Sequence, residues 1–333
     1  MSLEKKSYDQ LITQIGNLLQ SGRKQAVQAV NTILVQTYWH IGQHIVVFEQ
    51  KGNERAEYGS QLFERLSKDL TLLYGKGFSR SNLLYMRKLY QCFPISETLS
   101  HLLTWSHYFE ILKADNPLEI SFYSKQCEHE KWSVRDLKRQ MKSCLFERLA
   151  LSKDKEGVLK LAKEGHIVET PDDLMKDPFI LEFLNIPQQN QFLESELEEK
   201  IISNLQQFIM EMGKGFAFIG RQYRMSVGGK HFYLDLLFYH RILKCFVLVD
   251  LKRGEIDHLD VGQMNLYLNY FKKEEATEGD NEPIGIILGA KENHILVEYA
   301  TDSITNKVLL RKYQLYLPDK KMLQNALEKL LKD

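Results

Sequence analysis

The chain has 333 residues, of which 44% are apolar and 26% are charged, and its 44 basic residues balance its 44 acidic residues. This composition is typical of a globular protein of about two domains. A net charge of zero excludes attraction to nucleic acid through a global field, so such binding would need local basic patches. Four scattered cysteines without a CxxC pair argue against a zinc module and against a disulfide framework. No apolar stretch reaches membrane-spanning length, so we expect a cytoplasmic protein that is not exported and has no membrane partner.

The N-terminal part of the sequence predicts helices almost throughout. From Tyr8 to about Leu151, apolar residues recur at three- and four-residue spacing and prolines are rare. We therefore expect an all-helical domain over residues 1–152. Residues 153–192 contain three prolines and an acidic pair, which predicts a linker region. A second domain is then expected over residues 193–333.

Two predicted helices surround a short glycine turn in the first domain. The first runs from about Gly59 to Leu73, and Ser79 caps the second. The second helix carries Arg80, Arg87 and Lys88 and no acidic residue. This pattern favours a helix-turn-helix or winged-helix-like unit that contacts DNA. An α-hairpin with a solvated basic face explains it equally well.

The sequence of the second domain predicts an alternation of helices and strands. Gly228 and Gly229 form the expected turn of a β-hairpin. The expected elements are a helix at 194–211, strands at 216–227, 232–239 and 244–251, a helix at 261–271, a strand at 284–288, a short segment around Val297 and a strand near Val308.

Two of these strands carry charged residues inside apolar runs. Asp235 lies within the run Phe232–Tyr239, and Asp250 and Lys252 end the next one. Alternate residues of a strand point to the same face, so Asp250 and Lys252 should lie together. Carboxylates are ligands that Mg²⁺ prefers, and a nearby lysine suits phosphodiester hydrolysis. The alternative is a structural ion pair between strand ends, although burial of charge more often indicates function.

Other candidate site residues surround this set. Glu198, on the helix before the strands, could bind the metal ion or its waters, although an acidic first turn is also favoured by the helix dipole alone. Gln263 on the following helix could contact the water or phosphate, and otherwise it is a surface residue. His231 and His240 flank the second strand, but carboxylates suit a hard cation better.

Basic residues gather on the same segment. Between Gly215 and Arg253 there are seven Lys or Arg residues and only two acids, Asp235 and Asp250. We take Arg221, Arg224 and Lys230 as candidates for phosphate contacts, which position a duplex without reading its sequence.

Several stretches together are similar to one protein family. From roughly Ser79 to Leu317 the chain resembles the bacterial YhcG-like (DUF1016) proteins, whose C-terminal domain belongs to the PD-(D/E)xK nuclease superfamily. The resemblance rests on five segments, Gly77–Leu83, Thr104–Tyr108, Gly215–Gln222, Asp235–His240 and Gly262–Asn265.

The resemblance implies a fold and an activity. The expected fold is an N-terminal helical domain followed by a restriction-endonuclease-like αβββαβ domain with a mixed sheet. The superfamily motif assigns its aspartate to Asp235, its (D/E)xK element to Asp250–Lys252, its helical glutamate to Glu198 and its later glutamine to Gln263. The residue at position 250 is Asp, whereas Glu is commoner in the family, and the motif accepts either.

The implied function is a Mg²⁺-dependent endonuclease, with Mn²⁺ as a possible substitute. Asp235, Asp250 and Glu198 would bind the metal ion and Lys252 would assist the attacking water. The partner would be nucleic acid, most simply DNA. A homodimer and a protein partner of the N-terminal domain are further possibilities. A silent DNA-binding or adaptor protein, a junction resolvase and an RNA nuclease remain alternatives.

Overall fold

The computed structural model describes residues 2–50, 56–174, 176, 178–187, 193–292 and 305–332, and the chain divides into two compact units, residues 1–138 and 139–333. The first unit ends before residue 152, where the sequence predicted the end of the helical domain. The segment predicted around Val297 lies outside the described residues. Within those residues, no helix is both long and apolar enough to cross a membrane.

The N-terminal unit is helical, as its apolar spacing predicts. Its elements are α1 (Ser2–Gln50), α2 (Ala56–Tyr74), α3 (Arg80–Cys92), η1 (Ser96–Thr98), α4 (Trp105–Ile111) and α5 (Pro117–Glu130), and α6 (Val134–Lys142) crosses the boundary between the units. Ser79 caps α3 by accepting a hydrogen bond from the Asn82 amide at 3.2 Å. Helix α1 crosses α3 so closely that a Cβ on Gly42 would lie 2.0 Å from the Met86 carbonyl oxygen. Glycine at this position therefore sets the packing of the two helices.

The basic side chains of α3 have acidic partners from other elements. Arg87 Nε lies 2.7 Å from Glu49 of α1, and Lys88 Nζ lies 3.3 Å from Asp115. Arg80, at the start of the helix, is exposed. Although α3 itself carries no acidic residue, Arg87 and Lys88 therefore form ion pairs with acids from elsewhere in the unit. Arg87 and Lys88 contribute to the packing of the unit.

The C-terminal unit contains a six-stranded sheet and its covering helices. Its elements are α7 (Leu145–Ala150), α8 (Lys155–Glu164), η2 (Pro171–Leu174), β1 (Phe179–Ile180), η3 (Glu182–Leu184), α9 (Glu194–Ser203), α10 (Leu205–Met212), β2 (Phe216–Val227), β3 (Lys230–His240), β4 (Cys245–Ile256), α11 (His258–Tyr270), η4 (Phe271–Glu275), β5 (Ile284–Glu292), β6 (Lys307–Gln314) and α13 (Lys320–Lys332). The region expected to be a linker therefore carries α8 and β1. The helix expected at 194–211 is two helices, because the chain leaves helical geometry at Asn204.

The sheet is mixed, with strand order β1-β6-β5-β4-β3-β2. Strands β2, β3 and β4 are antiparallel neighbours, whereas β4, β5, β6 and β1 pair in parallel. Gly228 and Gly229 both have positive φ and form the turn between β2 and β3. Because β4 is central and β3 adjoins it, charged residues on these two strands lie in the middle of the domain.

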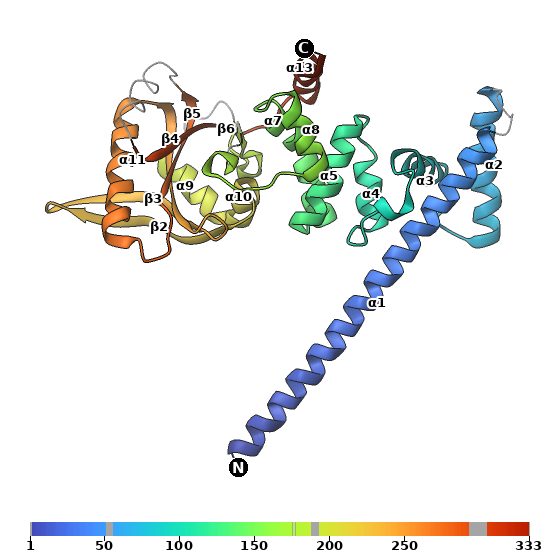
Figure 1. The fold of residues 1–333 in the computed structure, drawn as a ribbon, viewed down its shortest axis with the longest axis horizontal. Helices are drawn as coiled ribbons and strands as arrows, with labels where there is room; N and C mark the ends of the chain where they lie inside the picture. The colour runs from blue at the N-terminus through green and yellow to red at the C-terminus, as the bar shows by residue number, and fades with distance from the viewer. Residues whose placement is uncertain are drawn as a thin grey trace. The chain divides into compact units, whose positions relative to one another are not determined.

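Both faces of the sheet are covered. One core cluster joins strand residues such as Val247 and Val249 to α9 and α10, and a second joins Leu237 and Leu248 to α11. Figure 1 shows α11 along one side of the sheet and α9 and α10 on the other. A carboxylate in the covered middle of β4, such as Asp250, is consequently held away from bulk water, where its negative charge is destabilising.

A buried ion cluster fixes α10 to the elements that precede it. Glu211 is fully buried and its carboxylate contacts Arg148 at 2.9 Å and Arg139 at 3.3 Å. Burial alone would raise the pKa of Glu211, but the charges of Arg148, Lys176 and Arg139 outweigh it and lower the pKa to about 2. Glu211 therefore stays ionised, and by accepting a hydrogen bond from the Ile180 amide it ties α10 to β1 at the edge of the sheet.

Candidate active site

Strands β3 and β4 bring Asp235 and Asp250 opposite each other. Leu236 pairs with Val249, so the next positions along the antiparallel pair are Asp235 and Asp250. An Asp235 carboxylate oxygen accepts a hydrogen bond from the Leu251 amide at 2.8 Å. Lys252, two residues beyond Asp250 on the same strand face, places Nζ 2.9 Å from the Asp250 carboxylate. The structure thus gathers the three residues that the sequence singled out.

Both carboxyl groups have pKa values above their ordinary range. Burial raises the pKa of Asp250, and the charge of Asp235 adds to this, so that the pKa reaches about 7 despite the opposing charge of Lys252. The pKa of Asp235 is also raised, first by burial and then by the charge of Glu198, against the Leu251 hydrogen bond. Burial lowers the pKa of Lys252, but Asp250 and Asp260 outweigh it, so the net shift is upward. Lys252 is therefore a fixed cation beside two carboxylates that resist ionising together.

Glu198 reaches this group through a residue that the sequence did not single out. The Gln222 amide donates to Glu198 at 2.6 Å and to Asp235 at 3.1 Å. Gln222 lies on β2 between the paired positions Arg221–Leu236 and Tyr223–Leu234, which sets it across from Asp235. Its φ of 48° departs from strand geometry just after an irregularity in the β2–β3 register. Neither signal is visible in the sequence, where Gln222 is one polar strand residue among several.

Helix α11 contributes a second side chain that the sequence did not single out. Asp260, in the first turn of α11, contacts Lys252 Nζ at 3.2 Å, so Lys252 bridges two acids. Gln263, which the sequence did suggest, instead contacts the Tyr267 hydroxyl. The charges of Asp250 and Lys252 act on Tyr267, so Gln263 lies one side chain away from the acidic pair. A capping-box aspartate could have been found from the spacing of Asp257 and Asp260.

The other candidate residues lie at a distance from the pair or have structural partners. Arg221, Arg224 and Lys230 are exposed on the β2–β3 hairpin. Arg224 contacts His231, which also faces Ser226 at 3.0 Å. The fully buried His240 contacts the Lys214 carbonyl oxygen at 2.9 Å. Both histidines therefore take part in local strand-end contacts.

The oxygen-rich group fits a hard divalent cation. Two carboxylates lie side by side against their mutual repulsion, and an amide NH₂ group already bridges Asp235 and Glu198. This is a place where positive charge is favourable, and oxygen ligands suit Mg²⁺ or Mn²⁺. As the side chains lie, no three His, Cys, Asp or Glu residues of the described chain form a ready metal cage. A bound ion would therefore complete its coordination shell with water molecules. Alternatively, it would displace the Gln222 amide from between Glu198 and Asp235.

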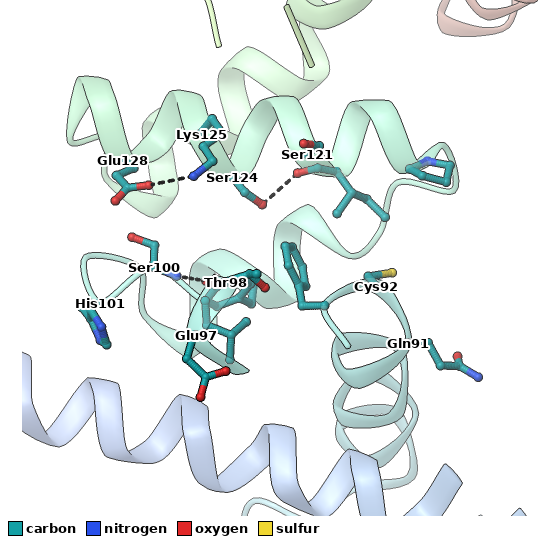
Figure 2. A pocket seen from close by; sticks show the side chains of 15 residues that line it. Gln91, Cys92, Glu97, Thr98, Ser100, His101, Ser121, Ser124, Lys125 and Glu128 are labelled. Carbon is teal, nitrogen blue, oxygen red and sulfur yellow. Dashed lines mark hydrogen bonds and ion pairs between the residues drawn. The ribbon is translucent and has the colours of Figure 1, made fainter. Parts of the chain in front are cut away.

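A separate cavity of about 680 Å³ lies in the N-terminal unit. It is lined by residues of α3, η1, α4 and α5, and its acids, Glu97 and Glu128, come from different elements. Lys125 of α5 lies 3.8 Å from Glu128 (Figure 2). Glu128 is therefore paired with Lys125, and Glu97 and Glu128 lie apart on different elements. The carboxylates of β3 and β4 remain the better candidate for hydrolytic chemistry.

Comparison with known proteins agrees with the resemblance seen in the sequence. The chain is 39% identical to the protein named "Putative nuclease YhcG" of Escherichia coli (strain K12), and the match covers 96% of this chain and 93% of that protein. The chain belongs to the YhcG family. Residues 14–148 match the DUF1016 N-terminal domain, and residues 172–328 match the YhcG PDDEXK nuclease domain. This YhcG-family protein is therefore a nuclease, with its nuclease domain in the C-terminal unit.

Solved structures give weaker likenesses. A repair endonuclease from Pyrococcus abyssi is 20% identical, covers 40% of this chain and 50% of that chain, and has a TM-score of 0.28. A complex titled EndoMS-dsDNA2 is 19% identical with a TM-score of 0.27, over 40% of this chain and 50% of that chain. With TM-scores this low, neither likeness supports an argument about the YhcG-family chain.

Proposed function

We propose that this protein is a cytoplasmic, Mg²⁺-dependent DNA endonuclease that also accepts Mn²⁺. The observation that carries the proposal is the apposition of Asp235 and Asp250 on neighbouring buried strands, with Lys252 2.9 Å from Asp250. A structural ion pair would need only one acid, whereas here Lys252 leaves a second buried carboxylate without full compensation. Such strained titratable groups cluster at functional sites.

Each residue has a distinct role in the proposed reaction. Asp235 and Asp250 would hold the metal ion, with Glu198 on the ion or its waters. A bound Mg²⁺ supplies a water nucleophile and charge neutralisation. The raised pKa of Lys252 keeps it protonated, so we assign it to orienting the attacking water and stabilising negative charge on the phosphate rather than to accepting a proton. Gln263 would support the site through Tyr267.

The substrate is proposed to be nucleic acid, most simply DNA, because basic side chains flank the carboxylates. Arg221, Arg224 and Lys230 are exposed on the hairpin that also carries Asp235. Contacts from such residues would position a duplex. Arg80 is the exposed basic residue of α3, while Arg87 and Lys88 would first have to leave Glu49 and Asp115. We therefore keep residues 1–152 as a DNA- or partner-binding region and place cleavage in 193–333.

The test compares purified wild-type, Asp250→Ala and Lys252→Ala proteins on supercoiled, linear, single-stranded and branched DNA and on RNA. Each substrate is incubated with Mg²⁺, Mn²⁺ or EDTA. We expect metal-dependent cleavage by the wild type and a loss of about 10²-fold or more in both variants, as for removal of a transition-state-stabilising group. Glu255→Ala is the matched control, since Glu255 is an exposed acid on the same strand.

The outcomes separate the alternatives. Cleavage that persists in Asp250→Ala would overturn the site, and binding without any cleavage would identify an adaptor protein on a nuclease fold. Preferential cutting of branched DNA or of RNA would retain the site but change the substrate to that of a junction resolvase or an RNA nuclease.

A further inference from the structure

The N-terminal half of α1 presents a row of exposed apolar side chains. Leu11, Ile12, Ile15, Leu18 and Leu19 expose between 44% and 73% of their surface. They follow one another at the spacing of one helix face. Figure 1 shows this half of α1 projecting past α2 and α3 within the unit. A helix gains most of its stability by burying its apolar face, so this stripe, residues 11–19, is expected to have a partner.

The same unit contains an apolar groove of about 500 Å³. Its wall on α1 includes Ile45 and Phe48, and its opposite wall is formed by Leu62, Leu66 and Leu70 of α2. The groove and the stripe share α1, since Ile41, Ile45 and Phe48 lie near one end of the helix and the stripe lies near the other. An amphipathic helix laid into an apolar groove is a common mode of recognition. The groove, residues 41–78, therefore suits a segment like the stripe.

The stripe of one chain cannot fill the groove of the same chain. Ile15 and Ile45 lie on one uninterrupted helix, α1. With a rise of about 1.5 Å per residue, roughly 45 Å separates them along the axis. A straight helix cannot fold back over that distance, so the occupant must be another molecule.

The charge of α1 indicates what that molecule is. Between residues 8 and 48 the only Asp, Glu, Lys or Arg residues are Asp9, Arg23 and Lys24. A helix for an anionic membrane surface is normally rich in Lys and Arg on its polar face, which this one is not. Few like charges would meet if two copies paired. A second copy also supplies one stripe for each groove, which closes the assembly about a two-fold axis.

We propose that two copies of this chain pair through α1, antiparallel, so that the stripe of each copy lies in the groove of the other. With Ile15 opposite Ile45, Leu19 falls opposite Ile41 and Ile12 opposite Phe48. The two-fold axis then passes near Val30, itself 65% exposed. One arrangement thus covers the stripe, the groove and the exposed middle of the helix.

The first test is the mass of the full-length protein by sedimentation equilibrium. The wild type is expected to be a dimer, and Ile15→Glu/Leu19→Glu is expected to be a monomer with an unchanged C-terminal unit. Leu72→Glu/Leu73→Glu is the matched control, because both leucines are highly exposed on α2 and do not line the groove. A monomeric wild type, or a stripe variant that stays dimeric, would overturn the proposal.

The second test determines the pairing geometry. In chains that also carry Cys92→Ser, a tagged copy with Ile15→Cys is mixed with an untagged copy with Leu66→Cys and then oxidised. We expect a covalent heterodimer, and much less of it when Leu72→Cys replaces Leu66→Cys. Covalent homodimers of Ile15→Cys alone would instead show parallel pairing and refute the antiparallel arrangement. Neither test uses DNA cleavage, so the pairing and the proposed function can fail separately.

Discussion

At the scale of single residues, the most informative feature is the electrostatic repulsion between the carboxylates of Asp235 and Asp250. Two carboxylates on adjacent buried strands cannot both ionise at low cost, and Lys252 compensates only part of their charge. The i, i+2 spacing of Asp250 and Lys252 predicted one contact of this group. The contacts of Gln222 and Asp260 could not be predicted, because they depend on a strand irregularity and on where α11 begins.

This repulsion predicts a pH dependence of stability in the metal-free protein. The pKa of Asp250 is about 7 in the folded chain, above its ordinary value, so the folded state binds more protons than the unfolded state between roughly pH 4 and pH 7. The stabilisation that the protonated Asp250 gives the folded state is therefore fully present at low pH and is lost as pH rises through 7. Between pH 5 and pH 8 in EDTA, we expect the free energy of unfolding of the wild type to fall by on the order of 1–3 kcal/mol. The Asp250→Asn variant should not show this fall.

Urea unfolding followed by far-ultraviolet circular dichroism checks this expectation. Glu255→Gln serves as the control and should follow the wild-type pH profile, since Glu255 is exposed. Equal pH dependence in the wild type and in Asp250→Asn would show that the carboxylate pair is not under this strain.

At the scale of elements, the β2–β3 hairpin links the carboxylates to a basic surface. Its strands were predictable because two segments rich in aromatic residues flank a Gly-Gly turn. The break between α9 and α10 at Asn204 was not predictable, because the apolar spacing continues across it. Only the packing of the two helices against the sheet requires the break.

The hairpin predicts a specific salt dependence of DNA binding. Replacing Arg221 and Lys230 with alanine should weaken binding to all sequences alike, because phosphate contacts do not read bases. Each lost contact should also flatten the plot of log affinity against log salt by about 0.9. Fluorescence anisotropy of labelled duplex DNA in Ca²⁺, over a range of NaCl concentrations, measures both effects.

The control for the hairpin is Arg87→Ala. Arg87 is paired with Glu49 in the N-terminal unit, so its loss should leave the slope unchanged. An unaltered slope in the hairpin variant would assign DNA contact to another surface.

At the scale of the whole molecule, pairing through α1 would put two nuclease domains in one particle. If both proposals hold, one binding event could cut both strands. The wild type should then convert supercoiled plasmid to linear DNA with little nicked intermediate, whereas Ile15→Glu/Leu19→Glu should accumulate nicked circles. A gel time course with Mg²⁺ distinguishes these patterns, and Leu72→Glu/Leu73→Glu should behave like the wild type. Abundant nicked circles from the dimeric wild type would show that its two sites act independently.

The sequence by itself determined most of the helical and strand segments, the family resemblance and the three charged residues at the centre of the candidate site. These follow from local spacing, which sets the period of an element and the face on which a side chain lies. Only the tertiary structure decided that residues 153–192 contribute β1 to the sheet, that Arg87 and Lys88 have acidic partners, and that Gln222 bridges Glu198 and Asp235. Each of these depends on residues far apart in the chain, and such contacts arise from packing that no local pattern encodes.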